Sequence, residues 1–184
     1  MAGFDGVHRV HLVGLVRDLP LLEVAPGVRI AVLNILGDTE LAEAAGAELG
    51  GRIAELGPDV LVTAEAKSIA VTHAVATRLA NLPYVVLRKA YKAYMGEALR
   101  VETLSITTGA PQSLFLDDKD RRLLAGARAV IVDDVVSTGS TLRAMRELVG
   151  LAGATVVGEA AIFTEGEPGA WDDVIALGHL PLFR

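Results

Sequence analysis

The sequence predicts an α/β fold in which helices flank a central parallel sheet, and three observations lead to this prediction. Of the 184 residues, 52% are hydrophobic but only 4% are aromatic, so Val, Leu, Ile and Ala must build the core, as in buried parallel strands. From residue 59 onward, short apolar runs alternate with segments of helical periodicity, which implies parallel strands joined by right-handed crossovers. The length suits one domain with a small appendage.

The opening of the chain is interpreted as that appendage. Residues 7–16 are predicted to form a strand, residues 26–27 a Pro-Gly turn and residues 28–33 a second strand. Asp38 is then expected to cap a helix, because apolar residues recur at helical spacing after it until the Gly-Pro pair at 57–58.

The regular core follows along the chain. Four strands are expected at residues 59–63, 84–87, 128–132 and 154–163, and two helices at residues 69–79 and 142–151. Residues 89–126 break this rhythm, because they mix charges with Tyr, Thr, Gly and Pro. A long segment of this kind in a compact domain is typically a functional lid or a hairpin extension.

Charge and composition argue against several classes of protein. A formal net charge of −6 without a basic run argues against a nucleic-acid partner. The chain has no cysteine, which excludes disulfides and thiolate metal sites. The N-terminus lacks the pattern of a signal peptide and no stretch approaches about 20 apolar residues, so we expect no membrane partner and a cytoplasmic location.

Residues 130–141, Val-Ile-Val-Asp-Asp-Val-Val-Ser-Thr-Gly-Ser-Thr, carry the most information about function. A buried strand here delivers Asp133 and Asp134 to its carboxyl end, where parallel sheets bind their ligands. The loop that follows leads into a helix N-terminus, whose unpaired N–H groups and partial positive charge suit a phosphate. Its glycine permits close backbone approach, and its hydroxyls can donate to phosphate oxygens. The loop residues are Ser137, Thr138, Gly139, Ser140 and Thr141.

A simpler interpretation of the same stretch is an acidic turn followed by a capped helix, because Asp and Ser are ordinary turn and cap residues. Each residue alone fits that alternative, but the twelve-residue arrangement is much more specific. Two carboxylates beside a phosphate would repel it unless they accept hydrogen bonds from sugar hydroxyls or face a metal ion. The arrangement therefore favours a ligand that carries both phosphate and sugar hydroxyls.

Residues 130–141 resemble the signature with which type I phosphoribosyltransferases bind 5-phosphoribosyl-1-pyrophosphate (PRPP). The resemblance implies that Asp133 and Asp134 are catalytic residues that hold the ribose hydroxyls. It also implies that residues 137–141 bind the 5-phosphate. It extends over about residues 26–180, and is strong at this motif and weak near the N-terminus.

The resemblance also implies the type I phosphoribosyltransferase fold. That fold has a central parallel sheet flanked by helices, a small N-terminal hood that covers the base, and a flexible loop. We expect residues 1–184 to form a single such domain. The hood would comprise about residues 1–36 together with the C-terminal strand, and the core about residues 37–165.

Two cationic positions resemble the pyrophosphate site of the family. Residues 64–68 stand where adenine phosphoribosyltransferases carry a pyrophosphate-binding loop, so Lys67 and Ser68 are implied to bind PRPP. Lysine replaces an arginine there, which keeps the charge but loses the bidentate fork, and Ser68 replaces a frequent glycine. Arg88 and Lys89 resemble the Arg-Lys pair that meets pyrophosphate in the adenine and xanthine enzymes, with solvated surface charges as the alternative.

The residues that would recognise the base resemble those of the family less consistently. Glu102 resembles the glutamate near the purine in the flexible catalytic loop, which implies a catalytic and base-binding role, with an exposed loop charge as the alternative. Asn34 resembles the base-reading asparagine of the xanthine enzymes, with a turn residue as the alternative. Residues 26–28 resemble the adenine enzymes, and Thr164 stands where the xanthine enzymes carry a base-contacting lysine. The hood therefore leaves adenine and oxopurines both open.

The family resemblance implies a purine salvage enzyme that transfers phosphoribosyl from PRPP to a purine base, with adenine as the expected base. The products would be a nucleoside monophosphate and pyrophosphate. A xanthine or hypoxanthine enzyme and a non-catalytic PRPP-binding regulator are the alternatives, the latter disfavoured because the short N-terminus has no room for a helix-turn-helix. The resemblance further implies Mg²⁺ carried by PRPP, no metal site of the protein's own, and a homodimer.

Overall fold

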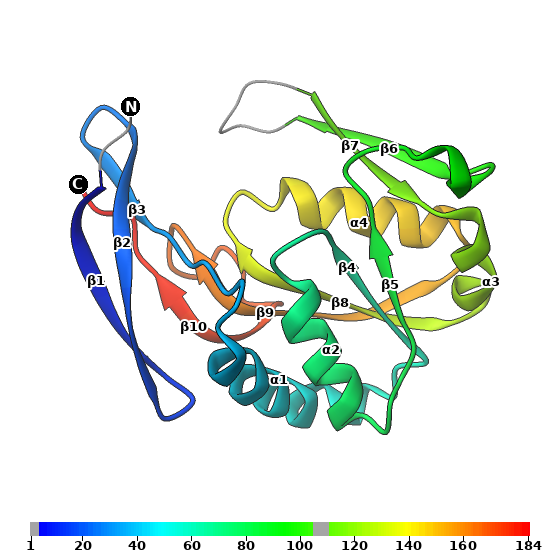
Figure 1. Cartoon of the computed structure of the whole chain (residues 1–184), viewed down its shortest axis with the longest axis horizontal. Helices are drawn as coiled ribbons and strands as arrows, with labels where there is room; N and C mark the ends of the chain where they lie inside the picture. The colour runs from blue at the N-terminus through cyan, green and yellow to red at the C-terminus, as the bar shows by residue number, and fades with distance from the viewer. Residues whose placement is uncertain (1–3, 105–110) are drawn as a thin grey trace.

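The computed structural model describes residues 4–104 and 111–184, and a five-stranded parallel sheet lies at its centre (Figure 1). The strand order is β10-β9-β8-β4-β5, and every pairing in this sheet is parallel. These strands are β4 (Val60–Ala64), β5 (Tyr84–Leu87), β8 (Arg128–Val136), β9 (Thr155–Glu165) and β10 (Ile175–Leu180). The α/β class predicted from the sequence is confirmed.

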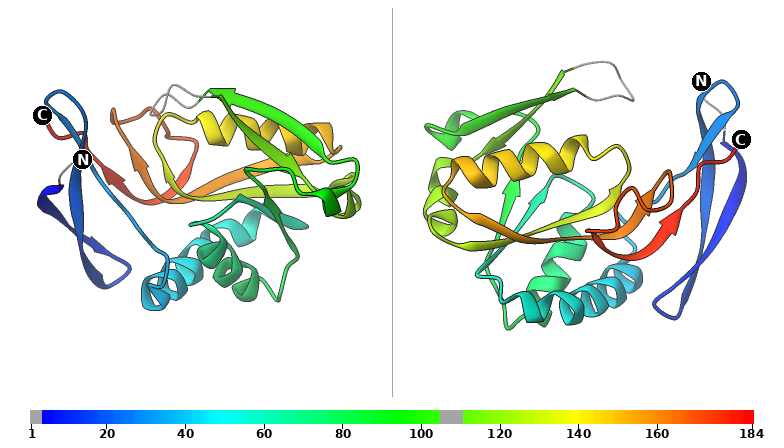
Figure 2. Two further views of the ribbon diagram at one scale, coloured as in Figure 1. Left: turned by 45° about the horizontal axis from the view of Figure 1, so that its top comes forward. Right: turned by 180° about the vertical axis from the view of Figure 1, so that it is seen from behind.

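Helices cover both faces of this sheet. Helices α1 (Thr39–Ile53) and α2 (Ile69–Arg78) lie on one face and α4 (Ser140–Leu151) on the other (Figures 1 and 2). Successive residues of β4 alternate between the two layers, since Leu61 joins the core under α1 and α2 while its two neighbours join the core under α4. None of the helices in the described ranges is long and apolar enough to span a membrane.

An antiparallel three-stranded sheet, here called the hood, stands beside this body. Its strands are β1 (Phe4–Leu12), β2 (Leu15–Ala25) and β3 (Val28–Ala31). The predicted strand over residues 7–16 is wrong, because the chain reverses at Val13 and Gly14 and Leu12 pairs with Leu15. Val13 adopts a φ of 48°, which β-branched residues rarely do, so Gly14, with a φ of 78°, is the turn signal that the sequence carries there. The turn at residues 26–27 is confirmed.

The helix predicted after Asp38 is confirmed with its cap. The Asp38 carboxylate accepts a hydrogen bond from the Leu41 backbone N–H at 3.1 Å. The helix continues through a 3₁₀ turn, η1 (Ala54–Leu56), and ends at Gly57, whose φ of 56° is left-handed. Asp38 therefore fixes where the hood linker stops and the first helix begins.

The irregular segment over residues 89–126 contains a hairpin, one of the two forms predicted for it. Strands β6 (Leu99–Leu104) and β7 (Pro111–Leu116) pair antiparallel and pack over α4 (Figure 1). Short helical turns surround the hairpin, namely η2 (Ala93–Met95), η3 (Asp118–Asp120) and α3 (Arg121–Leu124).

The C-terminal strand, which the sequence analysis grouped with the hood, pairs with β9 at the edge of the main sheet. Parallel pairing places β10 among the core strands because a right-handed crossover returns it beside β9. The chain then reaches the hood, where Phe183 and Arg29 exchange two backbone hydrogen bonds of 2.8 and 2.9 Å. This short contact near residue 183 pairs the end of the chain with the hood sheet.

Candidate functional site

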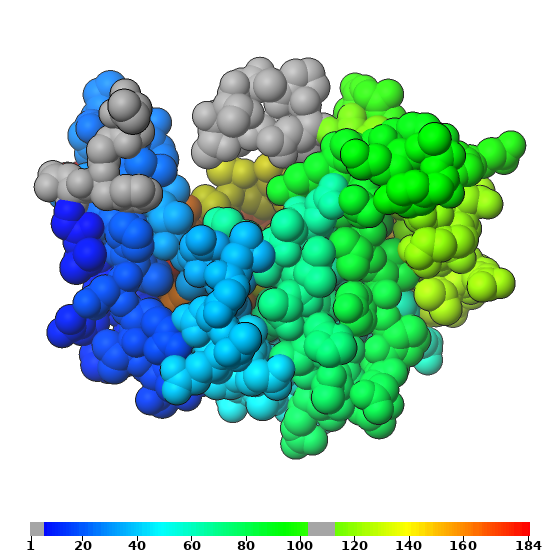
Figure 3. Space-filling model, viewed as in Figure 1, coloured from blue at the N-terminus to red at the C-terminus, as the bar shows by residue number. Residues whose placement is uncertain are grey.

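The carboxyl ends of β4, β8 and β9 lie side by side at one end of the main sheet, beside the hood. A cavity of about 330 Å³ opens there. Its walls are residues 30–33 at the hood, residues 64–68 after β4, the end of β8, Lys89 and Glu165. In the space-filling view, the surface is hollowed between the blue hood and the green hairpin (Figure 3).

A second cavity, of about 300 Å³, adjoins the first around the loop between β8 and α4. The two cavities share Lys89, Asp133 and Ser137 in their linings. The second cavity is also lined by the loop residues Thr138, Gly139, Ser140 and Thr141. The structure thus brings the acidic pair and the whole predicted phosphate loop into one continuous site.

The acidic pair lies near the end of β8, two residues before its last residue, Val136, and its two side chains have different surroundings. The Asp133 side chain is buried and accepts a hydrogen bond from the Asp134 backbone N–H at 2.9 Å. Burial first, and then the neighbouring charge of Asp134, raise the pKa of Asp133 to about 8. A carboxyl group in a cavity whose pKa is strongly shifted often marks a functional site. Among the described residues, Asp133 is the clearest case.

The phosphate-loop backbone has the form expected of an anion site. Gly139 occupies the N-cap position of the twelve-residue α4 with a φ of 70° and has no side chain to cap the helix, although the Thr138 hydroxyl oxygen accepts a hydrogen bond from the Ser140 backbone N–H at 3.4 Å. The Thr138 and Ser140 hydroxyls form a hydrogen bond with each other, with their oxygens 3.1 Å apart, so the two hydroxyls lie side by side in the loop. Helix N-terminal N–H groups and two hydroxyls together make a suitable seat for a phosphate.

Trp171 packs on this loop, a contact that the sequence analysis missed. The Trp171 indole N–H donates to the Ser137 carbonyl oxygen at 2.9 Å. A Cβ added at Gly139 would lie 2.1 Å from a Trp171 ring carbon, so only glycine fits beneath this ring. The signal available in the sequence was that the single tryptophan of the chain follows a Pro-Gly turn close to the motif.

The loop after β4 places Lys67 in the first cavity. The Lys67 Nζ donates to the Leu33 carbonyl oxygen at 3.0 Å and lies 4.0 Å from Asp134 Oδ2. Ser68 also lines this cavity, but its hydroxyl is buried and donates to the Ala64 carbonyl at 3.0 Å. Lys67 therefore brings a positive charge to the site, whereas the Ser68 hydroxyl holds the loop itself.

The predicted Arg-Lys pair is divided between two places. Lys89 lines both cavities, while Arg88 lines a separate cavity of about 530 Å³. The Arg88 guanidinium donates to Glu65 at 2.6 Å and to the Tyr94 hydroxyl at 3.1 Å. These two partners, Glu65 first, raise the pKa of Arg88. Only Lys89 of this pair reaches the acidic motif in the structure.

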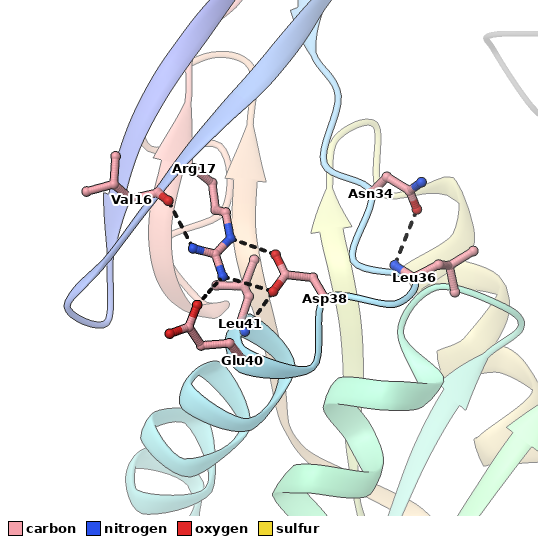
Figure 4. A network of polar contacts seen from close by, with 7 residues as sticks. All are labelled: Val16, Arg17, Asn34, Leu36, Asp38, Glu40 and Leu41. Carbon is pink, nitrogen blue, oxygen red and sulfur yellow. Dashed lines mark hydrogen bonds and ion pairs between the residues drawn. The ribbon is translucent and has the colours of Figure 1, made fainter.

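Neither residue predicted to contact a base lines these two cavities. The Asn34 side-chain oxygen accepts a hydrogen bond from the Leu36 N–H at 3.3 Å, which is the turn role given above as the alternative (Figure 4). Glu102 lies on the β6–β7 hairpin, where its exposed carboxylate pairs with Arg100. Asn34 instead lines a cavity of about 370 Å³ beside α1, together with Arg17.

Glu165, which the sequence analysis did not select, does line the first cavity. Its side chain is only 5% exposed. Burial raises the pKa of Glu165, although a hydrogen bond from Ser137 and the nearby His179 act in the opposite direction. The predicted strand ends at residue 163, two residues before Glu165. The available signal was a glutamate two residues after an apolar run.

A family model with the description "Phosphoribosyl transferase domain" matches residues 34–175 of this chain. A "Hypoxanthine/guanine phosphoribosyltransferase" of Methanothrix soehngenii is 36% identical over 62% of this chain and 57% of its own length. A "Xanthine phosphoribosyltransferase" of Chloroflexus aurantiacus is 37% identical over 73% and 64%. An "Adenine phosphoribosyltransferase" of Rhodospirillum rubrum is 32% identical over 71% and 73%.

The fold itself is similar to that of solved structures. A crystal structure of adenine phosphoribosyltransferase from Thermoanaerobacter pseudethanolicus has a TM-score of 0.65, covering 94% of this chain and 95% of that one at 22% identity. This similarity concerns the fold, including the hood and the parallel sheet. The chain spans about three fifths of the length of the first two curated relatives described above.

Proposed function

Because the chain belongs to the phosphoribosyl transferase domain family, we propose that it transfers the 5-phosphoribosyl group of PRPP to a ring nitrogen of a purine base. The products are a nucleoside monophosphate and pyrophosphate. Adenine is the base we propose, and a xanthine or hypoxanthine activity is the alternative, since relatives named for each of these bases have similar sequences.

One observation carries this proposal: the two adjoining cavities match the parts of PRPP and its acceptor. The phosphate loop at the start of α4 lines one end, the acidic pair lies in the middle, and the hood lines the other end. A ligand with a phosphate, a ribose and a leaving pyrophosphate next to an apolar base pocket fits this order. We therefore assign the 5-phosphate to residues 137–141 and the base to the hood end.

The chemistry follows from the charges along the cavities. The bond from the anomeric carbon to pyrophosphate breaks as the base nitrogen forms its new bond, so negative charge grows on the leaving group. Lys67 and Lys89 stabilise that charge electrostatically, while Asp133 and Asp134 hold the ribose hydroxyls and fix the geometry. The Lys67 ammonium exchanges the Leu33 carbonyl for a pyrophosphate oxygen in this mechanism.

The remaining predicted residues keep their roles as part of the proposal. Arg88 reaches the pyrophosphate after leaving Glu65, and Ser68 contributes its backbone at the start of α2. Glu102 comes to the base with a movement of the β6–β7 hairpin, which would exclude water from the reacting carbon. Asn34 contacts the base if the linker before α1 turns its amide toward the cavity.

We propose that Mg²⁺ enters with PRPP, because pyrophosphate is dense in charge and Mg²⁺ prefers hard oxygen ligands with several waters retained. Asp133 and Asp134 are the carboxylates beside that substrate-borne ion, and its charge would offset their repulsion of the phosphates. Residues 4–104 and 111–184 contain no group of three or more His, Cys, Asp or Glu side chains that could hold a metal ion. We also propose a homodimer, which light scattering would test.

The direct test is pyrophosphate release from PRPP and Mg²⁺ with adenine, hypoxanthine, guanine and xanthine supplied one at a time. Calorimetry with PRPP and Mg²⁺ alone measures binding in the same preparation. Release with adenine supports the proposal, and release with an oxopurine alone supports the alternative. PRPP binding without release from any base favours a regulator, and absence of PRPP binding overturns the assignment of the site.

A further inference from the structure

Glu165 brings a buried carboxyl group to the hood end of the first cavity. It is the last residue of β9, which pairs with β8 beside the phosphate loop. The side chain is 5% exposed, yet the residue lines the cavity together with residues 30–33 of the hood. Glu165 therefore lies in the wall of this cavity and is shielded from bulk solvent.

Among the residues that the structure describes, Ser137 is the hydrogen-bond partner of this carboxyl group, which leaves capacity for a ligand. Ser137 donates a hydrogen bond to it, and His179 is the nearby group that favours its charge. Within the described ranges, no Lys or Arg forms an ion pair with Glu165. A carboxylate offers about four acceptor positions, and buried polar groups are usually satisfied. Donors from a bound molecule would complete its hydrogen bonds.

The position of Glu165 in the cavity determines which part of the substrate it meets. Under the function proposed above, the phosphate loop, Asp133 and the lysines take the phosphates and the ribose of PRPP. The base then lies at the hood end, where residues 30–33 cover its ring. Within the described ranges, Glu165 has no Lys or Arg partner, whereas Glu65 in the same lining is paired with Arg88.

The chemistry of an ionised carboxyl group favours one class of base. A carboxylate accepts hydrogen bonds and cannot donate them, so it attracts amino N–H groups and repels carbonyl oxygens. Adenine carries a 6-amino group, whereas hypoxanthine and xanthine carry a 6-carbonyl. We propose that Glu165 is a specificity-determining residue that selects a base with an exocyclic amino group. This inference rests on the proposed function and names its substrate class.

Product nucleotides allow a test that does not depend on turnover. We would measure the affinity of AMP and IMP by calorimetry, since these nucleotides differ only at the 6-position and its ring nitrogen. The unmodified protein should bind AMP about tenfold to a hundredfold more tightly than IMP, the range expected when a buried acceptor loses its donor. Tighter binding of GMP than of XMP would extend the preference to the 2-amino group.

The isosteric variant Glu165→Gln separates recognition from folding. Its amide can still accept from Ser137, but it can also donate to a carbonyl oxygen, so it should lose most of the preference for AMP while PRPP affinity stays unchanged. Glu167→Gln is the matched control, because Glu167 lies two residues away and its side chain is 79% exposed. This control should keep the unmodified preference for AMP.

Two results would overturn the inference: equal or tighter binding of IMP by the unmodified protein, or an unchanged preference in Glu165→Gln. Failure of the proposed function looks different, because AMP would bind with its Glu165-dependent preference while no base released pyrophosphate from PRPP. If neither nucleotide binds, the base site and the proposed function both fail. Circular dichroism of each variant confirms that the fold is retained.

Discussion

The Lys67 ammonium donates to the Leu33 carbonyl oxygen at 3.0 Å, and so joins the loop after β4 to the linker that leaves the hood. The same Nζ lies 4.0 Å from Asp134. One cation thus contacts both the hood linker and the acidic pair. The arrangement joins three segments that are far apart in the sequence.

Replacing Lys67 by alanine should weaken PRPP binding about tenfold to a hundredfold, the usual loss for one charge-assisted hydrogen bond. Calorimetry with PRPP and Mg²⁺ measures this directly. Base affinity should change less, because a neutral base gains less than the charged pyrophosphate from a nearby ammonium group. Lys119→Ala, on an exposed side chain outside both cavities, is the control. A larger effect on the base than on PRPP would place the pyrophosphate elsewhere.

Replacing Asp133 by asparagine should abolish turnover, since the ribose loses an acceptor, and should also change how stability depends on pH. The pKa of Asp133 is raised to about 8 in the folded protein from an ordinary 3.8. Between about pH 4 and 8 the native state therefore retains a proton that the unfolded chain releases, so stability falls as pH rises through this window.

Thermal melts from about pH 5 to about pH 8 should show a smaller loss of stability in Asp133→Asn than in the unmodified protein. Asp172→Asn, at an exposed position, serves as the control and should melt in parallel with the unmodified protein. Parallel melts for all three proteins would show that Asp133 is not a buried acid with a raised pKa.

Gly139→Ala should destabilise the phosphate loop and reduce PRPP affinity by at least tenfold. The new Cβ would meet Trp171 at 2.1 Å, and a left-handed φ of 70° costs about 1–2 kcal/mol for residues other than glycine. Gly150→Ala, in the same helix with no atom near its added Cβ, should be neutral or stabilising. Urea melts and PRPP calorimetry check both variants, and equal behaviour of the two would contradict this account.

Arg17 holds the hood against the first helix (Figure 4). Its guanidinium, on β2, pairs with Asp38 at 2.6 Å and with Glu40 at 2.8 Å. Arg17→Ala should raise the KM for the base several-fold and leave PRPP affinity unchanged, because only the hood end of the cavity loses support. Arg9→Ala removes an ion pair within the hood and is the matched control. Initial-rate kinetics distinguish the two variants, and an equal KM would refute the role of Arg17.

Much of the fold could be predicted because local signals and tertiary structure agree. The helix after Asp38, the strand over residues 84–87 and the strand-loop-helix around Asp133 all follow from periodicity, caps and small residues. The hairpin turn at Val13 and Gly14 was missed, because the left-handed backbone at Val13 falls on a β-branched residue. There the tertiary pairing of β1 with β2 overrides the local preference.

The site residues, too, could be predicted only in part. The acidic pair and the phosphate loop are contiguous in sequence, so their motif could be recognised directly. Glu165 and Trp171 reach the site from β9 and the turn after it, and only the strand order of the sheet brings them beside Ser137. The ion pair that draws Arg88 away from the two cavities could not be predicted. Its partner, Glu65, lies 23 positions earlier in the sequence, and no local pattern indicates this pairing.

The backbone pairing of Arg29 with Phe183 has a consequence for biosynthesis. The hood strands are synthesised before the parallel sheet, but the pairing of β3 with the end of the chain needs Phe183, about 150 residues later. Because nascent chains fold from the N-terminus onward, the β1–β2–β3 meander forms before the sheet and gains this backbone contact only after β10 has been made.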